Sequence, residues 1–288
     1  MTESAPAAED WSPSPHQLVL AGARRRLDRR RRLMSTVVTL VVLGAVVAGV
    51  LVSPGWPRVR DYFLSWHQAR GSFHSITVGF WVNIRIFLIA EPSVLILGAA
   101  VAVVRQSKTP WLAPLRLLAV VYADLLRGVP SLLVLAVVAV GVPALQLEGV
   151  PSSPFWLATV ALVLCYTAYV SEVLRAGILA IHPTQRASAD ALGLSSGQTL
   201  FHVVLPQAVR RVVPPLMNDL VSLQKDTSLV STVGVWDAMN AANDWQSYQF
   251  NGTSLVVASL YFLVIAVPLT RLTDWLLMRQ IRREQGAL

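Results

Sequence analysis

The sequence is poor in cysteine and in charged residues. It holds one cysteine, Cys165, in 288 residues, so no disulfide can form within the chain. Charged residues make up 14% of the chain, against about 25% in an average soluble domain. Segments of alternating hydropathy about 10 residues long are missing as well, which argues against a membrane β-barrel.

Groups that perform catalysis or bind nucleotides are also missing. The sequence has no G-x-x-x-x-G-K-[ST] phosphate loop. Its five histidines, at positions 16, 67, 74, 182 and 202, lie outside the long apolar segments. A membrane-embedded enzyme would need an H-E-x-x-H cluster, or Ser, His and Asp at a matching depth. The sequence therefore predicts a protein that is not an enzyme, with no catalytic residues, no metal ligands and no cofactor of its own.

Apolar residues are abundant instead, at 54% of the chain. A helix needs about 20 apolar residues to cross a bilayer, and several segments reach that length. We therefore expect an all-α, polytopic helical membrane protein with about six transmembrane helices. The expected spans are Met34–Ser53, Ile76–Val104, Leu117–Leu147, Pro154–Ala180, Leu216–Val235 and Ser254–Met278. The third is interrupted by Asp124, Arg127 and Pro130, and the fifth is unusually polar.

The distribution of positive charge predicts the orientation. The formal net charge of +8 would suggest nucleic acid for a soluble protein, but cytoplasmic loops of membrane proteins collect Lys and Arg. With the N-terminus inside, 19 of the 24 Lys and Arg residues fall in inner segments and three in outer ones. We therefore expect a multi-pass protein of the plasma membrane with both termini in the cytoplasm and no nucleic-acid partner.

This topology divides the chain into five parts. Residues 1–33 form a cytoplasmic tail that starts with a disordered Ser/Pro/Ala-rich stretch and continues with seven arginines between Arg24 and Arg32. These arginines serve either as a topology anchor, which we favour, or as a site for anionic membrane lipid. Residues 34–53 are an extra N-terminal span, and 54–75 an external interfacial segment that contains Trp56, Tyr62, Phe63 and Trp66. Residues 76–282 form a five-helix core, and 283–288 a C-terminal tail.

A polar segment at residues 183–206 separates two spans on the expected cytoplasmic side; we call it the 183–206 corner. Pro183 suits the first turn of a helix, and Gly193 suits its left-handed C-terminal cap. Ser195 can cap a second helix, with Gln198 three residues later returning the bond. Pro206 marks the return to the membrane.

The 183–206 corner places Leu192 and Leu194 on either side of a glycine. Such an exposed apolar point suits a groove on another protein. The residues alone support equally a helix pair buried against the protein's own lipid-facing surface.

The same segment resembles the EAA loop of binding-protein-dependent ABC importer permeases. That pattern reads E-A-A-x-A-x-G, followed after about nine residues by an apolar residue and L-P. Ala187–Gly193 matches the first part and Val203–Pro206 the second. In the family this loop docks on the ATPase subunit. The resemblance implies that role for Ala187, Ala189, Asp190, Leu192, Gly193, Leu194 and Pro206, although Ala187 stands where the family has its glutamate.

Three further stretches extend the resemblance: one resembles the family's lead into the loop, and the stretches from Ala123 and Pro214 resemble the polar amino acid permeases in particular. ADLLRGVPSLLVL begins at Ala123, TAYVSEVLRAGILAIHPTQ at Thr167 and PPLMNDLVSLQKDTSLVS at Pro214. The segment from Gly79 resembles the opening of the family core, with Asn83 and Ile84 where Thr and Leu are usual. The resemblance implies a type I (MetI-like) permease fold and a pathway for a polar amino acid. It also implies several partners: a second permease subunit, ATPase subunits that bind ATP and Mg, and an extracytoplasmic binding protein.

Polar side chains inside the spans predict the path or its gates, because a charge in the bilayer needs a partner or a water-filled cavity. Asn218, Ser222 and Lys225 share one helix face by their spacing. The candidates are Arg85, Glu91, Asn218, Ser222, Lys225, Asp226 and Thr227.

Structural roles compete for the charged candidates. Arg85 and Glu91 could instead form ion pairs between spans, and for Lys225 and Asp226 we favour a structural or gating role over direct solute contact. Asp124/Arg127 and Glu172/Arg175 are expected to pair along their own helices.

An ion-coupled secondary carrier or a channel for a small polar solute remains the alternative function. Carriers often contain inverted repeats, and the sequence shows no convincing internal repeat. A purely structural or signalling subunit is a weaker alternative, because it would have no need of charges inside its spans.

Overall fold

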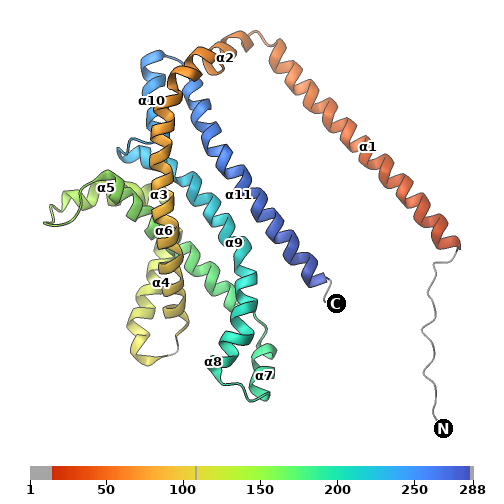
Figure 1. Cartoon of the computed structure of the whole chain (residues 1–288), viewed down its shortest axis with the longest axis vertical. Coiled ribbons are helices and arrows are strands. Elements are labelled where there is room, and N and C mark those ends of the chain that lie inside the picture. The colour runs from red at the N-terminus through yellow and green to blue at the C-terminus, as the bar shows by residue number, and fades with distance from the viewer. Residues whose placement is uncertain (1–14, 108, 286–288) are drawn as a thin grey trace. The chain divides into compact units, whose positions relative to one another are not determined.

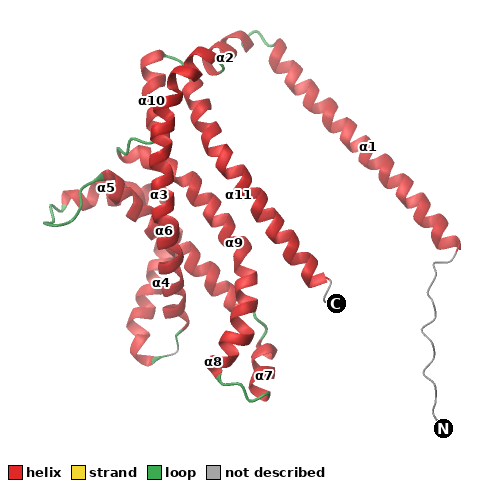
Figure 2. Ribbon diagram, in the orientation of Figure 1, coloured by secondary structure: helices red, strands yellow, loops and turns green. Residues whose placement is uncertain are grey.

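The computed structural model describes residues 15–107 and 109–285, and every regular element within them is a helix (Figures 1 and 2). The elements are α1 (Pro15–Val52), α2 (Trp56–Phe63), α3 (Trp66–Gln106), η1 (Pro110–Leu112), α4 (Ala113–Gly128), α5 (Ser131–Ala144), α6 (Pro154–Leu179), α7 (Pro183–Ala191), α8 (Ser196–Thr199), η2 (Leu200–Val204), α9 (Leu205–Asp226), η3 (Thr227–Val233), α10 (Ala238–Gln249) and α11 (Thr253–Gln285).

The chain divides into two compact units, Met1–Asp61 and Tyr62–Leu288. In the first unit, α1 begins at Pro15 and includes the arginine-rich stretch as well as the apolar one. Its part from Arg30 to Val52 is long and apolar enough to cross a membrane. Most of the stretch predicted to be disordered precedes Pro15 and lies outside the described residues.

Four helices in the described chain are long and apolar enough to be membrane spans, or five if one bent pair counts as a span. The bent pair is Pro110–Gly128 with Ser131–Ala144, and its axes differ by 109°. The interruption expected in the span Leu117–Leu147 is therefore a sharp bend between two helices. Its break follows from Pro130, because the residue before a proline avoids helical backbone, and Val129 is extended.

The expected fifth span, Leu216–Val235, differs more. The helix α9 starts earlier, at Leu205, and ends at Asp226, where the tighter turns of η3 take over. The left-handed Gly234, with φ of 85°, then stops η3. Because α9 is too polar, it is not among the helices that qualify as spans by composition.

Two other helices, α3 and α11, extend beyond the spans expected from the sequence. The helix α3 begins at Trp66, well before the expected start at Ile76, so the interfacial segment is itself largely helical. At the other end of the chain, α11 continues to Gln285 and includes the first part of the expected C-terminal tail.

The main core lies between α3 and α6, which run side by side in the second unit (Figure 1). Ile86, Ala90 and Val94 of α3 are almost completely buried, as are Ala158 and Leu162 of α6. Lipid tails are as apolar as these side chains, so close packing rather than hydrophobic transfer must hold the helices together. The alanines allow that close approach.

A second core joins α3 to α10 and α11. It contains Ile76 and Phe80 of α3, Ala238 and Ala242 of α10, and Ala258 of α11. Gly79 makes the closest approach possible, because a Cβ there would lie 2.5 Å from the backbone carbonyl of Asp237. This contact fixes the start of α10 against the N-terminal part of α3.

Candidate coupling corner and transport path

The first half of the 183–206 corner is the short helix α7, and both of its ends are capped. At the start, the ring of His182 accepts a bond from the backbone N–H of Thr184 at 3.3 Å. At the end, Gly193 takes a φ of 81°. The N–H of Leu194 donates to the Ala189 carbonyl at 3.1 Å and that of Gly193 to Asp190 at 3.0 Å. This is the glycine cap predicted from the sequence.

The second half begins with the predicted capping box. The N–H of Ser195 donates to Oε1 of Gln198 at 2.9 Å, and the N–H of Gln198 donates to Oγ of Ser195 at 3.3 Å. The helix that follows is not separate, however. After the four residues of α8, the π-helical turn η2 leads directly into α9, with Pro206 in the first turn of α9. The second half of the corner is thus continuous with the long helix α9.

Burial in the 183–206 corner separates its inside from its outside. Ala189 and Val204 are buried against the rest of the chain, whereas Ala187 and Asp190 are exposed and Leu194 is half-buried. Leu192 is 81% exposed. The corner thus presents an exposed leucine at the C-terminal end of α7.

A cluster of ion pairs precedes the corner in the sequence and is centred on Glu172 of α6. Its carboxylate pairs with Arg175 on the same helix, as predicted. It also pairs with Arg105 of α3 at 2.9 Å and with Arg127 of α4 at 3.4 Å. The predicted Asp124–Arg127 pair is therefore wrong: Arg127 turns to the carboxylate on the neighbouring helix. A half-buried carboxylate with several arginine donors gains more than an exposed pair along one helix.

The path candidates on α9 divide into two groups. Asn218, Ser222 and Lys225 are all exposed, as their shared helix face predicts. The two residues after Lys225 turn inward: Asp226 accepts bonds from Tyr166 Oη at 3.0 Å and Ser131 Oγ at 3.3 Å. Thr227 is buried and its hydroxyl donates to the Gln224 carbonyl. These two residues are held by protein partners.

The path candidates on α3 do not pair with each other. Arg85 is exposed, and its guanidinium lies 5.2 Å from the ring centre of Phe155 on α6. This is a cation–π contact rather than an ion pair. Glu91 is half-buried and forms no ion pair within the described chain.

A buried polar crossing, made by Asn83, Thr227 and Asp237, joins α3 to the segment between α9 and α10. Nδ2 of Asn83 donates to the Thr227 carbonyl and to Oδ2 of Asp237, each at 2.9 Å. Oδ1 of Asn83 accepts from the N–H of Ala238 at 3.1 Å. The other oxygen of Asp237 caps α10 by accepting from the N–H of Asn240. Sequence reasoning missed this crossing, although Asp237 preceding α10 carried an N-cap signal.

Clusters of His, Cys, Asp or Glu able to hold a metal ion are absent from the part of the chain that the structure describes.

Comparison with known proteins agrees with this arrangement. Residues 94–282 match the family model of the binding-protein-dependent transport system inner membrane component. The chain belongs to this family. It is therefore a membrane-spanning permease subunit of a transport system and a multi-pass protein of the inner membrane.

Individual permeases are similar over most of their length. The arginine transport system permease protein ArtQ of Bacillus subtilis (strain 168) is 34% identical, over 68% of this chain and 87% of ArtQ. The probable glutamine ABC transporter permease protein GlnM of the same organism is 32% identical, over 67% of this chain and 87% of GlnM.

Solved structures support the same fold. A crystal structure of an amino acid ABC transporter with histidines aligns with a TM-score of 0.67 and 25% identity, covering 75% of this chain and 98% of that one. An inward-facing structure of the MetNI methionine ABC transporter aligns with a TM-score of 0.59 at 15% identity, covering 72% and 97%. The predicted MetI-like permease fold is thereby confirmed.

Proposed function

We propose that this permease forms the membrane pathway for a polar amino acid in an ATP-driven importer, and that a separate ATPase docks on its 183–206 corner. The observation that carries the proposal is the corner itself. Local bonds cap both of its halves, and it holds Leu192 81% exposed at its outermost turn. An apolar side chain kept rigidly outside the fold is suited to fill a pocket on a partner.

The power for transport would come from that partner. The chain has no phosphate loop, so ATP and Mg would bind to the ATPase and this subunit would perform no hydrolysis. Because η2 continues directly into α9, a push on the corner would be transmitted along α9 to its exposed polar face. This continuity supplies a physical route from the ATPase to the path.

The absence of the family's glutamate at Ala187 affects how the corner would be anchored. The methyl side chain of Ala187 cannot accept a hydrogen bond from the ATPase or form an ion pair with it. Asp190 is one helical turn further and exposed, so it can supply a carboxylate to the same partner. Apolar contact by Leu192, together with Asp190, would then replace the missing acid.

The remaining parts of the complex follow from the same proposal. A second permease subunit, identical or related, would complete the pathway, and an extracytoplasmic binding protein would deliver the amino acid. The arginine and glutamine named for the similar permeases are the first solutes to test. Both termini and the 183–206 corner would be cytoplasmic, because the inner segments collect the positive charge. Residues 1–33, 34–53, 54–75, 76–282 and 283–288 would be the tail, extra span, outer segment, permease core and C-terminal tail.

Within that pathway, the exposed face of Asn218, Ser222 and Lys225 would contact solute and water. Arg85 and Glu91 on α3 would contribute to the path or its entrance, whereas Asp226 and Thr227 would maintain the shape of the end of α9 through their protein partners.

Affinity purification of the full chain in mild detergent, followed by mass spectrometry, tests the proposal. We expect a stoichiometric ATPase that carries a phosphate loop. A cysteine placed at Leu194, in a Cys165→Ser background, should cross-link to that ATPase, and a cysteine at Arg58 should not. If no ATPase is recovered even after cross-linking through position 194, the corner is not a docking site and an ion-coupled carrier becomes the better model.

A further inference from the structure

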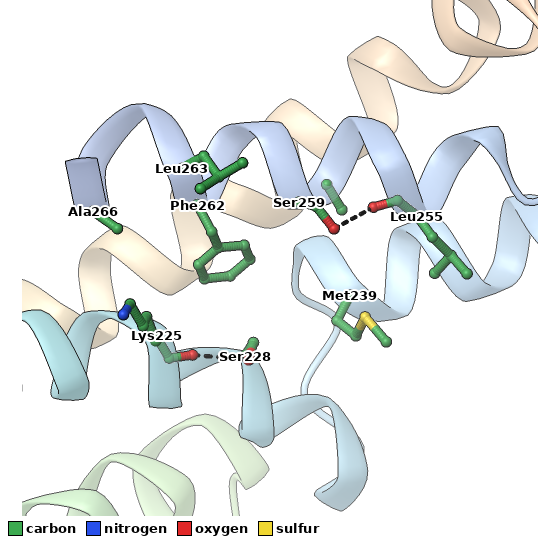
Figure 3. A pocket seen from close by; sticks show the side chains of 9 residues that line it. Lys225, Ser228, Met239, Leu255, Ser259, Phe262, Leu263 and Ala266 are labelled. Atoms are coloured by element: carbon green, nitrogen blue, oxygen red, sulfur yellow. Dashed lines mark hydrogen bonds between the residues drawn. The ribbon is translucent and has the colours of Figure 1, made fainter. Parts of the chain in front are cut away.

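The helix α11 has different surroundings on its two sides. Figure 3 shows one side, where Leu255, Ser259 and Phe262 of α11 line a cavity together with Lys225 of α9. The opposite side of α11 lines a separate groove of about 790 Å³, whose other wall is α3. This volume falls within the range typical of small-molecule sites. The groove is therefore large enough to hold a ligand of its own.

One stripe of residues from each helix forms the walls of the groove. The α11 stripe is Val257, Leu260, Tyr261, Val264 and Ile265, and the α3 stripe is Trp66, Ala69, Arg70, Phe73 and Phe80. Residues three and four positions apart lie on the same face of a helix, so each stripe is one continuous face. The two helices lie close together near their first residues and diverge further along the chain (Figure 1).

The groove offers one charged group to a ligand. Arg70 is exposed and forms no ion pair in the described chain, so its five N–H donors are available. The hydroxyl of Tyr261 is already used. Thr77 Oγ1 donates to the Phe73 carbonyl at 2.7 Å, and Tyr261 Oη donates to Thr77 Oγ1. The other lining side chains are aliphatic or aromatic, so the groove suits a ligand with one anionic group and a long apolar part.

The charge lies near one end of the groove. Arg70 lies four residues after Trp66, the first residue of α3. Phe80 lies ten residues after Arg70, which is about 15 Å further along the helix. That length is half of the hydrocarbon core, which is about 30 Å thick. Trp66 is 80% exposed, and tryptophan favours the level of the lipid headgroups. The groove therefore extends from the headgroups to the middle of the bilayer.

The size of the lining side chains argues against a protein helix as the occupant. Membrane helices pack closely where small residues let their backbones approach. Among the residues that line the groove, Ala69 alone is small, whereas Trp66, Phe73 and Leu260 are large. An acyl chain is thinner than a helix and fits between such side chains. A guanidinium also matches the oxygens of a phosphate group, to which it can form two parallel bonds.

We propose that this groove binds one glycerophospholipid, with its phosphodiester on Arg70 and one acyl chain between α3 and α11. The acyl chain would contact Phe73, Phe80 and Val264, and Trp66 would lie at the level of the headgroup. The orientation given under the proposed function places this lipid in the outer leaflet. The inference goes beyond that function, because binding of the lipid requires neither the ATPase nor the solute.

The test is a lipid titration of the full chain, purified in mild detergent with its partners and washed free of lipid. Native mass spectrometry measures the binding of palmitoyl-oleoyl phosphatidylglycerol. Palmitoyl-oleoyl glycerol has the same chains without phosphate, and glycerol 3-phosphate has the phosphate without chains. We expect one phosphatidylglycerol to bind about tenfold more tightly than palmitoyl-oleoyl glycerol, since hydrogen bonds to a charged group contribute a factor of this size. Glycerol 3-phosphate should not displace it. A diazirine in the acyl chain should label α3 and α11.

Two variants test the two ends of the groove. Arg70→Gln should weaken binding of phosphatidylglycerol about tenfold and abolish the preference for the phosphate-bearing lipid. Val264→Trp should fill the deeper end and weaken binding of both lipids; Val264 is 72% exposed, so the larger side chain leaves the core intact. Arg58→Gln on α2 and Val267→Trp on α11 are the matched controls. Both positions are exposed and lie outside the groove, so these variants should bind as the wild type does.

Four results would overturn the lipid site. The first is an Arg70→Gln variant that binds phosphatidylglycerol as tightly as the wild type. The second is equal binding of phosphatidylglycerol and palmitoyl-oleoyl glycerol by the wild type, because the groove would then accept any apolar chain. The third is displacement by glycerol 3-phosphate, which would make Arg70 a site for soluble phosphate. The fourth is a disulfide-linked dimer of Val264→Cys in the Cys165→Ser background, which would place a second copy of the chain in the groove.

These results are independent of the proposed function. Recovery of the ATPase tests the importer, and the lipid titration does not depend on that recovery. A complex that contains the ATPase but fails the lipid test overturns the lipid site alone. A chain that binds the lipid but recovers no ATPase overturns the proposed function alone.

Discussion

The 183–206 corner and the buried polar crossing are both built from polar groups, but they are held in different ways. In the corner, the capping partners are two to five residues apart, as with Ser195 and Gln198. In the crossing, Asn83 bonds to Thr227 and Asp237, which are 144 and 154 residues away. The capping residues of the corner are exposed, whereas Asn83, Thr227 and Asp237 of the crossing are buried.

This contrast separates stability from function. A long-range buried crossing can exist only when the helix bundle is assembled, so its bonds contribute directly to the tertiary fold. A corner that satisfies its own backbone needs little support from the bundle. It can therefore keep an apolar leucine at its surface and remain available for a partner. Substitutions in the two regions should accordingly affect different measurements.

The largest expected effect is the replacement of Asn83 by leucine. This change leaves Oδ2 of Asp237 and the N–H of Ala238 buried without that partner. We expect a loss of about 2–4 kcal/mol in the free energy of unfolding, since each buried unsatisfied group costs about 1–3 kcal/mol. The measurement is the thermal midpoint of the purified chain in detergent. Asn218→Leu, on the exposed face of α9, is the control and should change the midpoint little; equal midpoints for both variants would contradict the role of the crossing.

Replacing Gly79 by alanine tests the close packing of α3 against Asp237, which belongs to the crossing. A Cβ at this position would lie within 2.5 Å of the Asp237 backbone, so α3 and α10 must separate. Overpacking of this kind typically costs about 1–3 kcal/mol, measurable by the same thermal midpoint. Gly128→Ala is the matched helical control because nothing lies within 4 Å of its position. A Gly79→Ala variant as stable as Gly128→Ala would show that the contact is not tight.

Unlike the two variants of the crossing, Gly193→Val should change activity more than stability. Its left-handed backbone, with φ of 81°, costs a β-branched residue about 1–2 kcal/mol, although the space around it is open. Because that cost falls in the locally capped corner and not in the helix bundle, we expect the thermal midpoint of the bundle to change little, while substrate-stimulated ATP hydrolysis by the complex falls severalfold. Gly193→Asn, which tolerates the left-handed region, should retain most of that stimulation. Normal stimulation in Gly193→Val would exclude the corner as the coupling element.

The smallest expected effect is that of Gln198→Ala. This variant removes one of the two bonds of the capping box and leaves the N–H of Ser195 unpaired but exposed to water. The cost should be about 0.5–1 kcal/mol and confined to the corner. Hydrogen exchange of the amides around Ser195 should accelerate while exchange in α3 and α6 stays unchanged. Faster exchange throughout the bundle would mean that the corner is not self-contained.

The same contrast explains what could be read from the sequence. The cap at Gly193 and the Ser195–Gln198 box were predictable because each depends on residues a few positions apart. Pro130 marked the interruption of a span but not its 109° angle, which depends on packing. The partner of Arg127 was predicted wrongly because a nearer choice along the helix lost to Glu172 on another helix. Asn83 stood out only as a departure from the family pattern, since its partners are distant in sequence.

The uninterrupted length of α3 has a mechanical consequence. It continues for 41 residues through Pro92, which corresponds to about 60 Å, or twice the thickness of the hydrocarbon core. It packs on α10 near one end, and near the other end Arg105 binds Glu172. A stiff rod of that length amplifies rotation: a swing of about 5° around its midpoint displaces each tip by roughly 3 Å, in opposite directions. That displacement is as large as a hydrogen bond is long, so a small reorientation at one face of the membrane is sufficient to rearrange contacts at the other.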